Sequence, residues 1–153
     1  MEWRKVQSLA TASTLALTAG MATAQDRGIT YTLYGTPGLI EMPSAVADAD
    51  AQIATTLSYF GGQQRYSFTF QILPRLSGTF RYAGLEDYEG PGTGGYFDRS
   101  FDLRYQILTE GDRRPSLSVG LQDFVGTGRL SGEYIAASKT LSDSVRVTAG
   151  LGW

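Results

Sequence analysis

Strict alternation of apolar and polar residues between Arg65 and Tyr82 constrains the fold of this chain more than any other feature. Apolar side chains occupy every second position from Tyr66 to Ile72, and the same period resumes after Pro74. A period of two is typical of a β-strand with one apolar face, and the short break predicts a tight turn. The stretch therefore predicts an antiparallel β-hairpin with its aromatic residues on one shared face.

The same period recurs along the rest of the chain, from Ala51 to the carboxyl end. Besides the two strands of this hairpin, strands are expected near residues 52–60, 99–107, 116–125, 133–140 and 145–153. The 19 glycines and 9 tyrosines fit turns and strands better than a helical bundle. The sequence thus predicts an all-β fold, an antiparallel meander of about seven strands.

The amino terminus has the three parts of a secretory signal peptide. Arg4 and Lys5 precede a modestly apolar run, and Ala22-Thr23-Ala24 form an A-x-A cleavage site. The threonine content and the short length of this run argue against a membrane-spanning helix. We therefore expect residues 1–24 to be a signal peptide that is cleaved after Ala24, which makes the mature chain an exported one.

The sequence contains no cysteine and no histidine. This composition excludes disulfide bonds, thiol chemistry, imidazole metal ligands and a histidine-based catalytic triad. The formal net charge is -2, with both signs mixed along the chain, so there is no basic surface for nucleic acid. We expect a protein that is not an enzyme, binds no nucleic acid, and has no catalytic residue, metal site or cofactor.

A soluble β-sandwich and an outer-membrane β-barrel both show such alternation, so three further features decide between them. Charges inside the strands fall mostly on the polar face. Counted from an exported amino terminus, the loop over residues 86–98 lies outside the cell and the tight turn at Pro74 lies in the periplasm. The strands are also slightly long for a sandwich. These features favour an outer-membrane barrel whose aromatic residues face lipid.

Two charged residues break the alternation, because Arg99 and Asp123 lie at apolar positions. Both are expected near extracellular strand ends, where a charge costs far less than at the midplane of the bilayer. A β-bulge at Asp123 would explain its position equally well.

Charged residues on the polar face are the candidates for contact with a glycan in the barrel lumen. They are Arg81, Asp102, Arg104 and Arg146. The alternative is that these side chains pair with one another and only neutralise buried charge.

Three segments resemble the YjbH family of outer-membrane β-barrel proteins, which is associated with exopolysaccharide production. They are YGTPGLIEMPSA (Tyr34–Ala45), FDRSFDLRYQIL (Phe97–Leu108) and GLQDFVGTGRLSGEYIAASKTL (Gly120–Leu141). The resemblance implies a non-enzymatic component of the bacterial outer membrane that takes part in exopolysaccharide production or secretion. Its implied partners are outer-membrane lipid, exopolysaccharide and other secretion-system components.

The resemblance also suggests how the chain is divided. After the signal peptide, residues 25–50 form a lead-in segment with the motif GTPGLIEMPSA, and residues 51–153 form β-barrel strands. Because members of the family are several times longer, we expect this set of strands to be incomplete. Two alternatives stay open: a complete small eight-stranded outer-membrane barrel that ends at Trp153, and a secreted soluble β-sandwich that acts as a binding module.

Overall fold

The structure is a computed structural model that describes residues 28–87, 90, 92 and 94–153, so the expected signal peptide lies outside the described residues. The main sheet has seven strands: β3 (Ile53–Phe60), β4 (Gln63–Leu73), β5 (Leu76–Leu85), β6 (Tyr96–Leu108), β7 (Ser116–Gly126), β8 (Gly132–Thr140) and β9 (Arg146–Gly152). Two short strands, β1 (Gly38–Leu39) and β2 (Met42–Pro43), form a separate hairpin. The predicted all-β meander of seven strands is confirmed.

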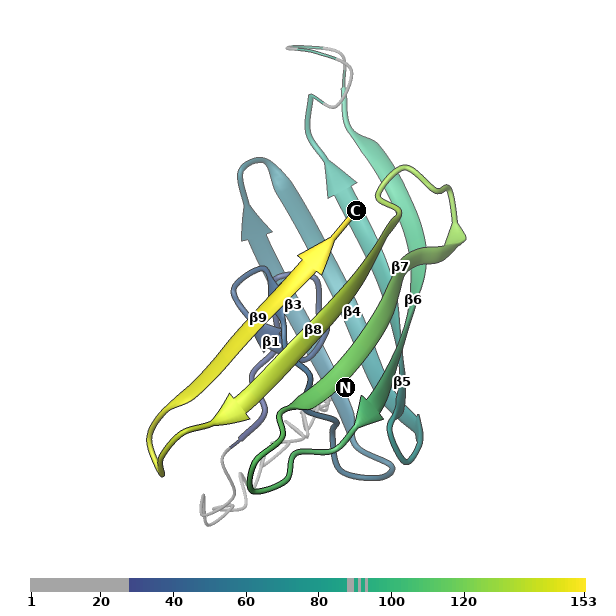
Figure 1. Ribbon diagram of the computed structural model, residues 1–153. Coiled ribbons are helices and arrows are strands. Elements are labelled where there is room, and N and C mark those ends of the chain that lie inside the picture. Colours follow the sequence, from purple (N-terminus) through teal and green to yellow (C-terminus); the bar gives the residue numbers. More distant parts are fainter. Residues whose placement is uncertain (1–27, 88–89, 91, 93) are drawn as a thin grey trace, which may run out of the picture.

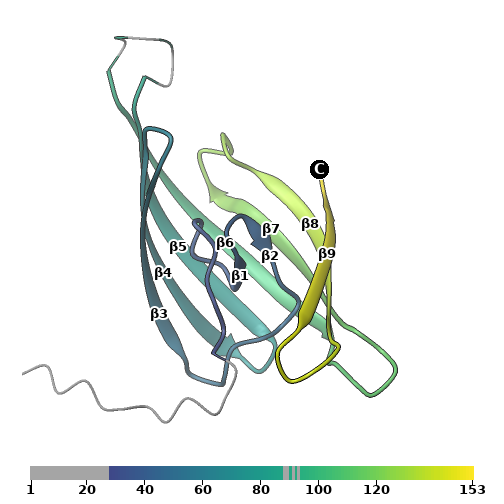
Figure 2. The same ribbon diagram turned by 90° about the vertical axis from the view of Figure 1, so that its left-hand side faces the viewer.

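Each strand of the main sheet pairs antiparallel with its neighbour in sequence, and the sheet curls into a half-barrel (Figure 1). Among the described strands, β3 and β9 are the two edges, since each has one partner only. Figure 2 shows β1 and β2 inside the curl, on the concave side of the sheet. The seven strands therefore form one curved layer around the lead-in segment, and not the two packed sheets of a β-sandwich.

The two faces of the sheet have the polarity opposite to that of a soluble domain. On β4, the concave residues Ser67 and Thr69 are each 2% exposed, whereas Phe68 between them is 43% exposed on the convex face. On β6, Asp102 is buried in the same way, and Tyr105 is 45% exposed. The alternation in the sequence thus places polar side chains in the buried interior and apolar side chains on the outer surface.

A β-bulge in β7 explains the misplaced charge of Asp123. Phe101 pairs with Val125 and Leu103 pairs with Leu121, so three residues of β7 lie opposite Asp102 alone. Asp123 adopts a φ of 49° within this bulge, and it is buried. Extra residues shift the register of a strand and redirect the side chain. Of the two explanations for Asp123, the bulge is the one that the structure adopts.

Arg99 remains on the convex face at the start of β6, where it is exposed. Its guanidinium lies 6.0 Å from the centroid of the Tyr82 ring, which is itself stacked on Phe97 at 5.7 Å. Arg99 therefore joins an aromatic group near the amino end of β6.

The loop between β5 and β6 is shorter than predicted. It was expected over residues 86–98, but β6 begins at Tyr96 and Asp98 is 1% exposed. Asp98 pairs with Ala83 in the sheet and accepts a hydrogen bond from the Thr127 hydroxyl at 2.7 Å. Polar residues alone do not distinguish a loop from the buried polar face of a strand, which is why the sequence misplaced this boundary.

Within the residues that the structure describes, no helix is long and apolar enough to cross a membrane.

We predict that Gly120→Ala lowers the free energy of unfolding by about 1–3 kcal/mol, because a methyl group there would overlap the ring of Tyr134 from the next strand. Gly132→Ala is the matched control, since its nearest neighbouring atom would lie at 3.6 Å. The control should change stability by less than about 0.5 kcal/mol. Urea unfolding in detergent micelles measures both, and equal effects would contradict the packing of Tyr134 on Gly120.

Candidate functional site

The lead-in segment binds the concave face of the sheet through its backbone carbonyls. The hydroxyl of Thr69 donates to the carbonyl of Gly35 at 2.6 Å, and that of Ser67 donates to the carbonyl of Tyr34 at 3.0 Å. Gly35 has a φ of 87°, and a Cβ there would overlap Ser67, so glycine permits this close approach. The start of the motif, at Gly35, is therefore held against β4.

The second half of the motif binds the middle of the sheet in the same manner. Arg104 donates to the carbonyls of Ser44, at 2.9 Å, and Val46, and Gln106 donates to the carbonyl of Ala45 at 2.7 Å. The backbone N–H of Ala45 in turn donates to the Ser138 hydroxyl at 2.9 Å. The lead-in segment thus reaches from β3, where Ser58 donates to the carbonyl of Leu33, to β8, and side chains of the sheet bind its backbone along the way.

An ion pair at the centre of the concave face joins the sheet to the lead-in segment. Arg81 and Asp102 form a bidentate pair, with Nη1–Oδ2 at 2.8 Å and Nη2–Oδ1 at 2.9 Å, and their side chains are 0% and 3% exposed. Arg81 also donates to the carbonyl of Tyr34 at 3.3 Å, and Asp102 accepts from the backbone N–H of Asp123 at 2.8 Å. One neutral unit therefore links the lead-in segment, β5, β6 and the bulge in β7.

Tyr34 contributes its ring as well as its carbonyl. The guanidinium of Arg65 lies 4.3 Å from the ring centroid, and that of Arg81 lies 5.2 Å from it. Two cations beside one ring are stabilised by its negative face. Tyr34 therefore lets two arginines of like charge occupy one buried region.

Tyr31 and Asp48 fix the two ends of the lead-in segment to each other. The Tyr31 hydroxyl donates to Asp48 Oδ1 at 3.0 Å and accepts from Gln52 Nε2 at 3.1 Å. Burial raises the pKa of Asp48 above its ordinary value, and burial together with the Asp48 charge raises the pKa of Tyr31 to about 12. At neutral pH the tyrosine is protonated, so it remains the donor in this pair.

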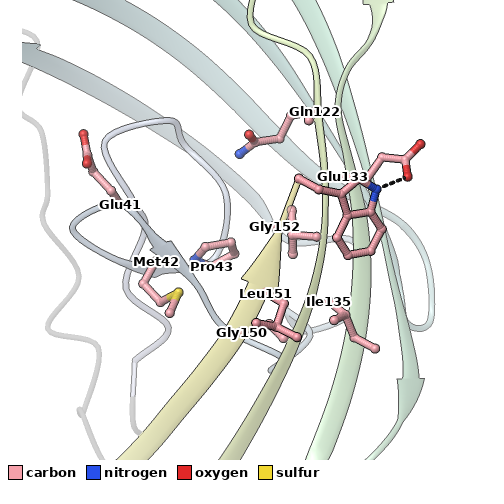
Figure 3. A pocket seen from close by; sticks show the side chains of 13 residues that line it. Glu41, Met42, Pro43, Gln122, Glu133, Ile135, Gly150, Leu151 and Gly152 are labelled. Carbon is pink, nitrogen blue, oxygen red and sulfur yellow. Dashed lines mark hydrogen bonds between the residues drawn. The ribbon is translucent and has the colours of Figure 1, made fainter.

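Two pockets lie where the lead-in segment approaches the edge strand β9. Figure 3 shows the first, with Met42 and Pro43 of β2 on one side and Gly150 and Leu151 of β9 on the other; its volume is 420 Å³. The second, of 590 Å³, is lined by residues of the lead-in segment and by Arg146 and Thr148 of β9.

The outer rim of the first pocket contains a bond between strands. Trp153 Nε1 donates to Glu133 Oε2 at 2.8 Å, the interaction drawn as a dashed line in Figure 3.

In the portion of the chain that the structure describes, no three acidic side chains converge in a way that would hold a metal ion.

The profile of a protein family described as "Exopolysaccharide biosynthesis protein YbjH" matches residues 30–153. The chain belongs to the YjbH family. The match begins within the lead-in segment and includes every strand of the main sheet. No curated protein and no solved structure matches the chain significantly.

In this YjbH-family chain, three of the four predicted site residues come together and one lies apart. Arg81, Asp102 and Arg104 are buried beneath the lead-in segment. Arg146 is exposed at the start of β9, and its hydrogen bond within the described residues runs from Nε to Thr140 Oγ1 at 3.4 Å. Whether any of the four contacts a glycan stays a prediction.

Sequence reasoning missed Arg65 and Tyr34 as members of this site. Arg65 lies on the polar side of the first hairpin, which was the available signal for a buried position. Nothing in the sequence places Tyr34 against it, because a contact between distant residues depends on how the lead-in segment folds back.

We predict that Asp102→Asn lowers the free energy of unfolding by about 3–5 kcal/mol, because Arg81 would remain buried without a counter-charge. The control is Glu110→Gln, which breaks the half-exposed pair of Glu110 with Lys139, at 3.3 Å. This surface pair should contribute less than about 1 kcal/mol. Urea titration of the full chain in micelles gives both values, and a loss at Asp102 as small as that at Glu110 would be inconsistent with a structural role for the central pair.

Proposed function

We propose that this chain is a β-barrel component of the bacterial outer membrane that takes part in exopolysaccharide production or secretion and catalyses no reaction. The observation that carries the proposal is the polarity of the sheet. Its concave face is polar and buried, and its convex face exposes large apolar side chains on six of the seven strands, all except β8. A surface of this extent needs an apolar covering, and lipid supplies one around the whole convex face.

The lengths of the central strands fit a bilayer. Strands β4 to β7 contain 11, 10, 13 and 11 residues. A tilted strand needs about 9–11 residues to cross the hydrocarbon core. Strands of this length are therefore sufficient for a transmembrane wall.

Exposed aromatic residues lie near the strand ends on the side of the long β5–β6 loop. Tyr59, Phe97 and Trp153 are 66%, 65% and 73% exposed. Membrane barrels place such residues in a girdle at the interface, where an aromatic ring meets both lipid and water. The bond from Trp153 to Glu133 suits this position, since the indole N–H has a polar partner while the ring stays apolar.

The two open edges favour a larger barrel. Backbone groups on the outer sides of β3 and β9 have no strand partner among the described residues, and lipid offers no hydrogen bonds to them. Seven strands also leave β3 and β9 running in the same direction, so antiparallel closure requires an odd number of additional strands. In this proposal the chain supplies one wall of a barrel that further strands complete.

The glycan part of the proposal rests on the family, whose description names exopolysaccharide biosynthesis. The chemistry of the concave face supports a structural or transport role in place of catalysis. Two of its buried charges, Arg81 and Asp102, bind each other, and Arg104 binds carbonyls of the lead-in segment. These groups hold the wall and the lead-in segment together, which is a structural role.

We predict that Phe80→Arg prevents stable insertion into the outer membrane. Phe80 lies at the middle of β5, pairs with Phe68 and Phe101, and is 45% exposed on the convex face. An arginine facing lipid near the midplane costs roughly 2–4 kcal/mol, whereas in water the same substitution would be harmless. Phe80→Leu is the control and should insert normally.

The measurement is the amount of each variant that fractionates with outer membranes after a urea wash. A normal membrane level of Phe80→Arg, or native chain that is released by the wash without detergent, would refute the membrane assignment. Loss of both variants would indicate a packing defect at this position and would also count against the assignment to lipid.

We also predict that the β5–β6 loop, residues 86–95, is exposed at the cell surface. The β5–β6 loop and the β7–β8 loop, residues 127–131, lie at one end of the sheet, and the β6–β7 loop, residues 109–115, lies at the other end (Figure 1). Proteinase K added to intact cells should cut this loop, whereas trypsin should cut after Arg113, at the opposite end, only in permeabilised cells. Trypsin cleavage at Arg113 in intact cells would reverse the orientation.

A further inference from the structure

Arg146 differs from the other predicted site residues in what its guanidinium contacts. Arg81 forms an ion pair with Asp102, and Arg104 donates hydrogen bonds to two backbone carbonyls. Arg146 is exposed, and among the described residues it makes one long hydrogen bond, to Thr140, through Nε. Arg146 also lines the second pocket, and its terminal nitrogens make no hydrogen bond among the described residues, so their planar pair of donors is available to a carboxylate.

The pocket beside Arg146 has the size and lining of a small-molecule site. Its volume is 590 Å³, within the range of about 300–1,000 Å³ that is typical of such sites. Aliphatic side chains of Leu39 and Met42 line it, together with the polar groups of Glu41 and Thr148. Leu39 and Met42 are 65% and 44% exposed, whereas Gly35 and Ala45 at the two ends of the motif are buried against the sheet.

Backbone strain accompanies this exposed apolar edge. Ile40, at the turn of the β1–β2 hairpin, has a φ of 56° and is 68% exposed. Left-handed backbone is unfavourable for a β-branched residue, and such strain is found preferentially where a local conformation serves a binding function. The hairpin thus holds Leu39, Ile40 and Met42 toward the pocket despite the cost of the turn.

We infer that this pocket binds an acidic glycan, with a sugar carboxylate on Arg146 and the apolar face of a sugar ring against Leu39 and Met42. The inference rests on the proposed function and adds the chemical class of the polysaccharide. Glu41 and Thr148 accept hydrogen bonds from ring hydroxyls. Arg146 follows the short β8–β9 turn, which lies on the periplasmic side in the proposed orientation, so the pocket meets the glycan before it reaches the cell surface.

The test uses the full chain in detergent micelles and two probes of equal length, trigalacturonate and the neutral maltotriose, in isothermal titration calorimetry. The native chain should bind trigalacturonate at least about tenfold more tightly, and added salt should weaken this binding. Arg146→Gln should remove the difference between the probes. Arg75→Gln is the matched control, because Arg75 is an exposed arginine in a turn at the same end of the sheet and lies outside the pocket lining.

Each result has a defined meaning. Loss of selectivity in Arg146→Gln with normal selectivity in Arg75→Gln supports the site. Equal binding of the two probes by the native chain, no binding of either, or equal losses in both variants overturns it. None of these outcomes affects the membrane assignment, which fractionation of Phe80→Arg tests separately.

Discussion

A polar sheet face can be buried only if its donors and acceptors find partners, and in this protein the lead-in segment provides many of them. The concave side chains donate and the lead-in backbone accepts, as in the bond from Thr69 to Gly35 and that from Gln106 to Ala45. The ion pair of Arg81 and Asp102 is fixed within the same network through the carbonyl of Tyr34. Without the lead-in segment these groups would be open to water, and the half-barrel would lose its interior.

The convex face follows from the same constraint. Because a strand alternates its side chains, a polar interior leaves the apolar side chains on the outside. The glycines at close contacts fit this arrangement. Gly120 makes room for Tyr134 in the interior, and Gly78 lies beneath the rings of Phe70 and Phe101 on the outer face. Local sequence, strand pairing and the polarity of the two faces therefore agree with one another, which is the condition for a single stable fold.

Much of the sheet could be predicted from the sequence, because period-two alternation depends on neighbouring residues only. The number of strands and the side of each residue on β4 and β6 follow from it directly. The same reasoning left the position of Asp123 undecided, since a bulge changes the parity without a distinctive residue type. It also placed Asp98 in a loop, because a buried polar strand and a solvated loop share the same composition.

The candidate site was harder to predict, because it depends on contacts between residues far apart in the chain. The alternation of the strands places Arg146 on the same polar face as Arg81 and Arg104, but the lead-in segment buries only Arg81 and Arg104. Its path is set by hydrogen bonds such as that from Ala45 to Ser138, which are separated by 93 positions. The role of the lead-in segment as the filling of the concave face is therefore a property of the folded chain.

The exposure of the convex face to lipid is the central claim, and spin-label accessibility tests it most directly. The chain has no cysteine, so single cysteines at Phe68, Phe80 and Leu151 can carry labels without background. In reconstituted vesicles, we expect frequent collisions with oxygen and rare collisions with a water-soluble nickel complex at all three positions. Frequent collisions with the nickel complex at these positions would show that the apolar face meets water and not lipid.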